Sequence, residues 1–147
     1  MTASSSPVPV PPRTFRSRTV GIAIDRPPQA VYDFAVTLEN LPQWASGLGA
    51  AGRRDGDDWV AQMEVGTVRI RFVARNDLGV LDHHVTLPSG EIVYSPMRVI
   101  ANGAGSEVSF TLFQLPSMTD AQFDADARTV ERDLTTLKTV VERSPLA

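Results

Sequence analysis

Residues 19–44 read TVGIAIDRPPQAVYDFAVTLENLPQW, and this stretch predicts a β-strand followed by two short helices. The first seven residues alternate with period two, which places Val20, Ile22 and Ile24 on one face of a strand. Pro27 and Pro28 then stop the strand and suit the first turn of a helix, where a backbone N–H would be unpaired in any case.

The two predicted helices differ in how they are specified. The first, from Pro28 to Val36, has an apolar stripe at helical spacing made by Val31, Phe34 and Ala35. The second ends in Trp44, and Asn40 is its expected N-cap because an asparagine side chain can accept from the free amides of a first turn. The glycine-rich segment 47–52 is expected to end it.

A long C-terminal helix is the clearest element of the chain. Thr119 and Gln122 have the spacing of a capping box, in which each side chain satisfies the other residue's backbone amide. Apolar residues then recur at steps of three and four, which predicts a helix about 30–37 Å long at 1.5 Å per residue. They are Phe123, Ala127, Val130, Leu134, Leu137 and Val141.

Between these helices the pattern is that of an antiparallel sheet. Asp55–Asp58 reads as a hairpin turn, and alternating segments predict strands separated by glycine-containing turns. The predicted strands cover residues 59–63, 67–72, 80–87, 91–100 and 106–115. Because a sheet with one apolar face needs a cover, we expect an α+β fold in which the long helix supplies it.

This order of elements resembles the START-like (SRPBCC) superfamily, which includes lipid-transfer domains, pollen-allergen-like proteins and polyketide cyclases or dehydrases. The resemblance covers about Arg16 to Glu142. It implies a helix-grip fold: a seven-stranded curved antiparallel sheet around a long C-terminal helix, with two short helices after the first strand. We therefore expect one START-like domain over residues 16–143, preceded by a disordered or extended Pro/Ser-rich tail over residues 1–15.

Composition narrows the possible functions of the 147-residue chain. A net charge of −3 argues against nucleic acid as a partner. The absence of cysteine excludes disulfides and Cys-ligated metals, and it is consistent with the cytoplasmic location that we expect. No apolar run is long enough for a transmembrane segment. The arginines of the central strands are expected on a mixed, solvated outer face, and the oligomeric state stays open.

His83 and His84 are the only two histidines. Adjacent strand residues point to opposite faces, so the pair cannot chelate one ion, and we expect no metal site. The alternation of Leu81, His83 and Val85 directs His83 inward and His84 to solvent. His83 is then a core histidine, a ligand contact or a general base.

Pro96 interrupts the predicted strand over residues 91–100, which implies an edge position or a bulge. We expect a bulge at Ser95-Pro96, because one extra residue would bring Ile92, Tyr94, Met97 and Val99 to one face. Tyr94 would then point inward and offer its hydroxyl to a ligand. His83 and Tyr94 are accordingly the candidate catalytic residues.

START-like domains enclose a hydrophobic cavity between sheet and helix, so the resemblance implies binding of a hydrophobic or amphipathic small molecule, such as a lipid, polyketide or aromatic metabolite. One alternative is a cofactor-free cyclase or dehydratase acting on such a ligand, and another is an interaction protein whose cavity is filled by its own side chains. No cofactor is expected. The expected ligand-binding residues are Trp44, Met63, Phe72, His83, Tyr94, Met97, Phe110, Phe123 and Val130.

Overall fold

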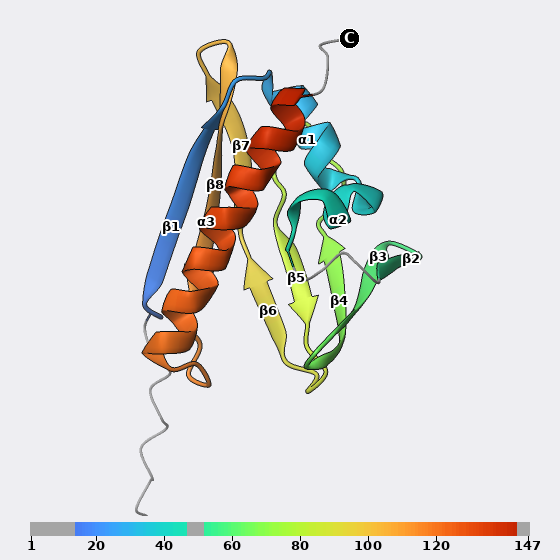
Figure 1. Cartoon of the computed structure of the whole chain (residues 1–147), viewed down its shortest axis with the longest axis vertical. Helices are drawn as coiled ribbons and strands as arrows, with labels where there is room; N and C mark the ends of the chain where they lie inside the picture. Colours follow the sequence, from blue (N-terminus) through green and yellow to red (C-terminus); the bar gives the residue numbers. More distant parts are fainter. Residues whose placement is uncertain (1–13, 47–51, 144–147) are drawn as a thin grey trace, which may run out of the picture.

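The computed structural model describes residues 14–46 and 52–143 (Figure 1). The chain begins with β1 (Ser17–Ile24), α1 (Pro28–Val36), the 3-10 turn η1 (Leu38–Asn40) and α2 (Leu41–Trp44). It continues with β2 (Gly52–Asp55), β3 (Asp58–Met63), β4 (Gly66–Phe72), β5 (His83–Thr86), β6 (Ile92–Ser95), β7 (Met97–Asn102), β8 (Gly105–Phe113) and α3 (Asp120–Arg143). The predictions for residues 1–13 and 47–51 lie outside the described residues.

The described strands form two antiparallel sheets, which corrects the prediction of one seven-stranded sheet. Three strands pair in the order β1-β8-β7, and five pair in the order β2-β3-β4-β5-β6. The described residues thus form eight strands rather than seven. One reason is that the segment predicted as a single strand over residues 91–100 forms both β6 and β7. The α+β class and the long C-terminal helix are as predicted.

Pro96 separates the two sheets. Proline has no N–H for a ladder bond, and here only its carbonyl is used, accepting from the Thr111 N–H at 2.9 Å. The segment predicted as one strand over residues 80–87 is also shared between the two sheets. Leu81 N–H donates to the Met97 carbonyl at 2.8 Å in one sheet, whereas His83 begins β5 in the other.

The predicted bulge at Ser95-Pro96 is wrong. Met97 and Val99 are buried, but Ile92 and Tyr94 have exposed fractions of 60% and 44%. The two pairs therefore face opposite sides, as alternation without an extra residue requires. Tyr94 therefore points outward, as Arg98 does, and not inward as predicted.

The capping box of α3 forms as predicted. The Thr119 N–H donates to Gln122 Oε1 at 2.9 Å, and the Gln122 N–H donates to Thr119 Oγ1 at 3.1 Å. The helix then lies along the three-stranded sheet, with β1 beside it (Figure 1). No helix in the described ranges is both long and apolar enough to cross a membrane.

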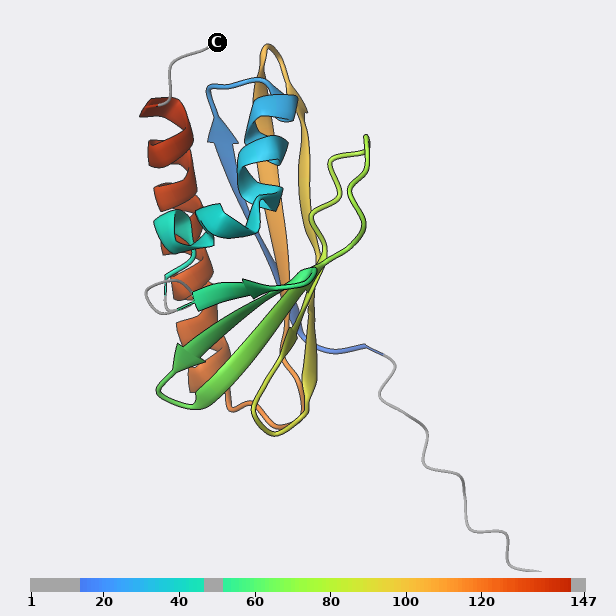
Figure 2. The same ribbon diagram turned by 90° about the vertical axis from the view of Figure 1, so that its right-hand side faces the viewer.

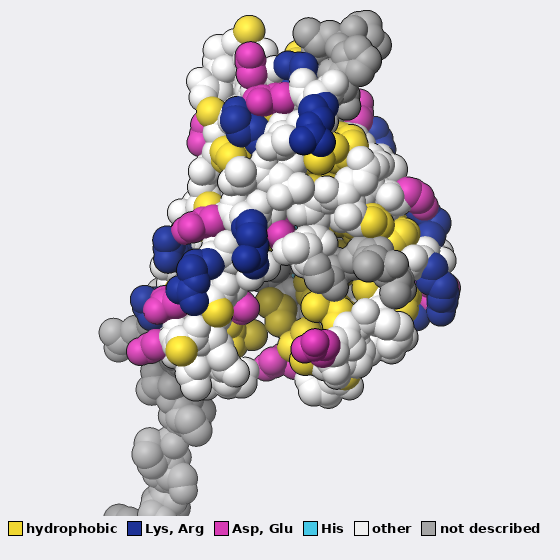
Figure 3. All heavy atoms as spheres, viewed as in Figure 1, with side chains coloured by type: hydrophobic (Ala, Val, Ile, Leu, Met, Phe, Trp, Pro, Cys, Tyr) yellow, Lys and Arg dark blue, Asp and Glu magenta, His cyan; other side chains and the backbone are white. Residues whose placement is uncertain are grey.

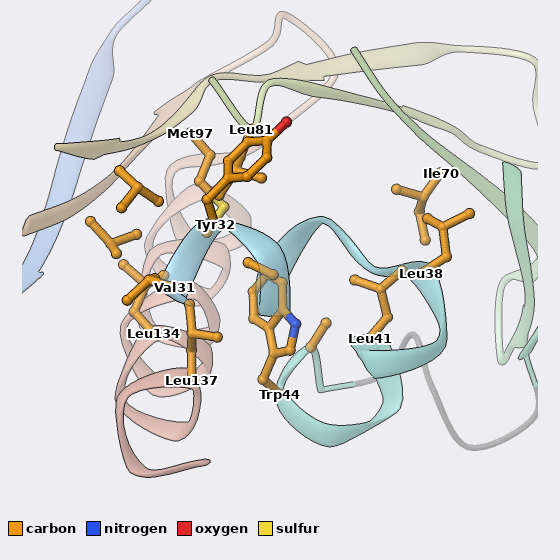
Figure 4. Packing of buried hydrophobic residues seen from close by; sticks show 14 of the residues in the cluster. Val31, Tyr32, Leu38, Leu41, Trp44, Ile70, Leu81, Met97, Leu134 and Leu137 are labelled. Carbon is orange, nitrogen blue, oxygen red and sulfur yellow. The ribbon is translucent and has the colours of Figure 1, made fainter. Parts of the chain in front are cut away.

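The core lies where α1, α2 and α3 meet the sheets. Val31 of α1 packs toward Leu134 and Leu137 of α3, and Trp44 lies beside them (Figure 4). All four residues are at most 6% exposed. The view turned by 90° shows α1 and α2 on the same side of the sheets as α3 (Figure 2).

Asn40 does not cap α2, contrary to the prediction. Its side-chain amide instead donates to the Phe34 carbonyl at 3.1 Å and makes no cap hydrogen bond. The reason is that η1 precedes α2 directly and holds Asn40 at helical φ and ψ, −89° and −12°, whereas an N-cap needs extended backbone.

The arginines on the outer face of β4 are exposed and mixed with acidic residues, as predicted, and they form ion pairs. Asp58 is only 7% exposed. It accepts from Arg69 Nη1 at 2.8 Å and from Arg71 Nε at 2.5 Å. These bonds lower the pKa of the Asp58 carboxyl, that from Arg71 most of all. The face is therefore held by ion pairs across the strands.

Candidate functional site: a cavity between helix and sheets

A cavity of about 600 Å³ lies between α3, α2 and the inner faces of the strands. Figure 3 shows the molecule hollowed at this place, with hydrophobic side chains on the floor. The alternation of β4, β5 and β8 sends every second side chain into it. Its wall includes Leu41, Trp44, Ile70, Phe72, Val85, Phe110, Val130 and Leu134.

Six of the nine residues predicted from the sequence border this cavity: Trp44, Phe72, His83, Tyr94, Phe110 and Val130. The other three, Met63, Met97 and Phe123, do not. Met97 and Phe123 are packed in the core with exposed fractions of 0% and 1%, and Met63 packs against the core cluster. Period alone cannot separate core from cavity wall, because both lie on the inner face.

His83 lies inside and His84 outside, as the alternation predicted. The His83 ring stands between Phe72 and Phe110, with ring centroids 5.0 and 5.6 Å away. Its Nδ1 lies 2.9 Å from the Leu81 carbonyl oxygen. A carbonyl can only accept, so Nδ1 carries the proton in this bond.

The protonation of His83 follows from its burial. Removal from water lowers the pKa of the imidazole, and this outweighs the opposing effect of the Leu81 bond. The ring is therefore neutral near pH 7, and Nε2 has an unprotonated lone pair. Within the described residues no hydrogen bond to Nε2 is found, so this atom is available to a ligand.

Tyr94 is not the inward hydroxyl that the sequence suggested. It borders the cavity, but its ring stacks on His84 of the outer face at 5.2 Å between centroids. Its hydroxyl donates to Asp82 Oδ2 at 2.8 Å, which raises the pKa of the Tyr94 phenol. The hydroxyl is therefore engaged on the side of the sheet away from the cavity.

The acidic residues of the wall were missed by the sequence analysis. Asp126 and Asp133 of α3 border the cavity, as does Glu91 ahead of β6. The signal was present, because Asp126 and Asp133 stand four residues before and three after Val130, on the same face of a helix. Partial removal from water raises the pKa of both carboxyls, although Asp133 is half-buried and Asp126 is exposed.

Asp133 also joins α3 to the end of α2. Its Oδ1 accepts from the backbone N–H of Ser46 at 3.1 Å and from the Ser46 hydroxyl at 2.5 Å. These two bonds partly offset the desolvation of the carboxylate. Asp133 is thus a structural acceptor at the rim, whereas Asp126 has no such partner among the described residues.

Trp44 carries a buried polar group without a partner. The Nε1–H of its indole is enclosed and has no hydrogen-bond acceptor in the described part of the chain. The apolar body of the ring fills the α2 side of the cavity wall. No group of three or more His, Cys, Asp or Glu residues suited to a metal ion occurs in residues 14–46 and 52–143.

The fold and cavity agree with the comparison to family models. The chain belongs to the polyketide cyclase / dehydrase and lipid transport family, whose model matches residues 16–142. This places it in the SRPBCC class that the order of elements suggested. A comparison with curated proteins gave no match.

Solved structures of the same fold share little sequence with this chain. Protein CV1439 from Chromobacterium violaceum is 12% identical with a TM-score of 0.66, over 86% of this chain and 97% of that one. Ara h 8.0201 is 12% identical with a TM-score of 0.64, over 88% and 99%. DynU16, from the dynemicin biosynthetic locus, is 14% identical with a TM-score of 0.64, over 86% and 47%. At such identities the likeness concerns the fold alone.

Proposed function

We propose that the protein binds a hydrophobic or amphipathic small molecule in the cavity between α3, α2 and the sheets. The observation that carries the proposal is the cavity itself, with a volume of about 600 Å³ and a largely hydrophobic wall. Ligand pockets in proteins typically measure about 300–1,000 Å³ and combine apolar walls with a few polar groups. Membership of a family that includes lipid transport supports the same proposal.

The test is direct binding of a neutral, environment-sensitive dye, N-phenyl-1-naphthylamine. We expect its fluorescence to rise and shift to the blue in the presence of the native protein, because the dye leaves water for an apolar site. Native mass spectrometry of gently purified protein would give the mass of any molecule carried from the host. A protein that binds no dye and carries no added mass would contradict the proposal.

A second candidate function is favoured by His83. A neutral imidazole with a free Nε2 on a cavity wall meets the geometric requirement for a general base. The protein would then be a cofactor-free cyclase or dehydratase, in which His83 removes a proton from the bound molecule. Tyr94 is no longer a candidate for the acid, because its hydroxyl bonds Asp82.

The two functions differ in whether the bound molecule changes. Once native mass spectrometry has identified a ligand, it would be incubated with the parent, with His83→Gln and with the control His84→Gln. Loss of turnover in His83→Gln alone, with dye binding kept, would support the enzyme. A ligand recovered unchanged from the parent would support a carrier.

A further inference from the structure

We propose that the cavity selects amphipathic amines and discriminates against fatty acids and other anionic amphiphiles. This inference rests on the proposed function, because it assigns a class of ligand to the same cavity. It is drawn from the charges and hydrogen-bonding groups of the wall. The apolar body of the ligand would lie on the hydrophobic floor, with its ammonium group at the rim.

The charged side chains of the wall all have one sign. Glu91, Asp126 and Asp133 border the cavity, and no lysine or arginine of the described residues does. Figure 3 shows acidic side chains at the edge of the hollow, beside the hydrophobic side chains. A carboxylate ligand would therefore meet repulsion and no counter-ion among the described residues of the wall.

Asp126 and Asp133, the two acidic residues of α3 on the cavity wall, differ from the other acidic residues of α3 in their ion pairing. Outside the cavity, the helix pairs its carboxylates with basic side chains at 2.6–3.6 Å: Asp120 and Asp124 with Arg16, Glu131 with Arg18, and Glu142 with Lys138. Asp126 and Asp133 make no such ion pair in the described part of the chain. Arg132 acts on Asp133 only through space, is exposed, and donates to the Thr129 hydroxyl at 3.4 Å.

The ammonium group of a bound amine would supply the counter-charge that the carboxylates of Asp126 and Asp133 lack. Asp133 is half-buried and Asp126 is exposed at the rim; partial removal from water without a counter-charge disfavours the ionised form of both, as the raised pKa of each carboxyl indicates. A cation within a few ångströms favours the ionised form again and gains binding free energy by doing so. An anionic head group at the same place would add to the penalty.

His83 is an independent observation that points the same way. The side chain is 7% exposed, and its Nδ1–H is used by the Leu81 carbonyl, which leaves Nε2 as an unpartnered acceptor in the wall. An N–H or O–H group of a ligand can donate to Nε2, but a carboxylate oxygen cannot. The indole N–H of Trp44 is the opposite kind of group, but it is enclosed by its neighbours.

The test compares three probes with the same ten-carbon chain and different head groups. Decylamine, decan-1-ol and decanoate would each displace N-phenyl-1-naphthylamine at about pH 7 and low salt. We expect decylamine to bind about tenfold or more tightly than decanoate, with decanol between them. Added salt should narrow this difference, because partly exposed charges are screened.

Two variants assign the effect to the cavity. Asp126→Asn should weaken decylamine binding about two- to fivefold, as expected for loss of one partly exposed charge pair. The control Asp124→Asn makes the same change on the same helix outside the cavity wall and should leave decylamine binding unchanged. Native mass spectrometry should show one decylamine bound per chain.

The outcomes separate the inference from the function on which it rests. Decanoate binding as tightly as decylamine, with dye and decanol still bound, would overturn the amine selectivity and leave the hydrophobic ligand site standing. Equal weakening of all three probes in Asp126→Asn would also overturn it, since it would show a change in shape rather than charge. Failure of the dye and all three probes to bind would overturn both.

Discussion

Asp82 and Arg98 form two parallel hydrogen bonds, from Nε to Oδ1 at 2.9 Å and from Nη2 to Oδ2 at 2.8 Å. The same carboxylate accepts from the backbone N–H of Met97 at 2.9 Å and from the Tyr94 hydroxyl at 2.8 Å. Asp82 precedes β5 of one sheet, whereas Met97 and Arg98 begin β7 of the other. One buried carboxylate thus replaces the ladder bonds that are interrupted at Pro96.

We predict that Asp82→Asn lowers the free energy of unfolding by about 1.5–3 kcal/mol, the usual value of hydrogen bonds to a charged group. The amide removes the charge and turns one acceptor into a donor that faces donors. Urea unfolding of the two proteins measures the difference. Tyr94→Phe removes only one of the four bonds, and because Tyr94 is 44% exposed, water can replace the lost donor; the cost should be about 1 kcal/mol or less. Equal losses in both variants would contradict the central role of the carboxylate.

We predict that the ionisation of the Asp82 carboxyl makes the stability of the protein depend on pH. The Arg98 hydrogen bonds, above all, lower the pKa of Asp82 from 3.8 to about 2. A carboxyl whose pKa is depressed in the folded state stabilises the protein above its unfolded pKa, and this contribution is lost as the pH falls toward the folded pKa. The contribution of Asp82 should therefore be complete above about pH 4 and fade toward about pH 2.

The measurement is the difference in unfolding free energy between the parent and Asp82→Asn at a series of pH values. Glu39, whose pKa is also lowered to about 2, titrates in both proteins and cancels from the difference. We expect this difference to shrink between about pH 4 and about pH 2. A constant difference across this window would show that the ionisation of Asp82 does not stabilise the fold.

Much of the fold could be predicted because its elements are specified locally. The stripe of α3 and its capping box are short-range patterns, and both formed as expected. The alternation of the strand predicted over residues 67–72 is also observed, because Ile70 and Phe72 both lie on the cavity wall. The junction of the two sheets could not be predicted in the same way, because Asp82 and Met97, which meet there, are 15 residues apart in the chain. Pro96 predicted an interruption of the strand, but the geometry of the interruption depends on Asp82, which is distant in the sequence.

The candidate site could also be predicted only in part. His83, Phe110 and Val130 were found because period 2 and period 3.6 define an inner face. The same criterion also selected Met97 and Phe123, which are core residues, since periodicity says nothing of where packing leaves a void. The acidic residues of the wall were missed because a carboxylate beside an apolar stripe is typical of any solvated helix edge.

We predict that Leu134→Ala costs about 2–5 kcal/mol, as large-to-small changes in a core do. Leu134 is 1% exposed and lies in the packed centre of α3, near Val31 (Figure 4). The control Thr135→Ala changes the exposed neighbour and should shift stability by about 0.5 kcal/mol or less. Thermal or urea unfolding tests both. A melting temperature unchanged in Leu134→Ala would show that this face of α3 is not the buried one.

Val130→Trp should separate a true cavity from a packed core. Val130 is half-buried on the cavity wall, and Ala127, three residues earlier on α3, is fully buried outside the wall. An indole at residue 130 can extend into the void, so we expect loss of dye binding with little loss of stability. An indole at residue 127 has no free space, and overpacking of that kind typically costs about 1–3 kcal/mol or more.

Dye titration and urea unfolding of Val130→Trp and Ala127→Trp measure both quantities. If Val130→Trp unfolds as readily as Ala127→Trp while the dye still binds the folded fraction, the dye site lies elsewhere and the cavity is closed by its own side chains.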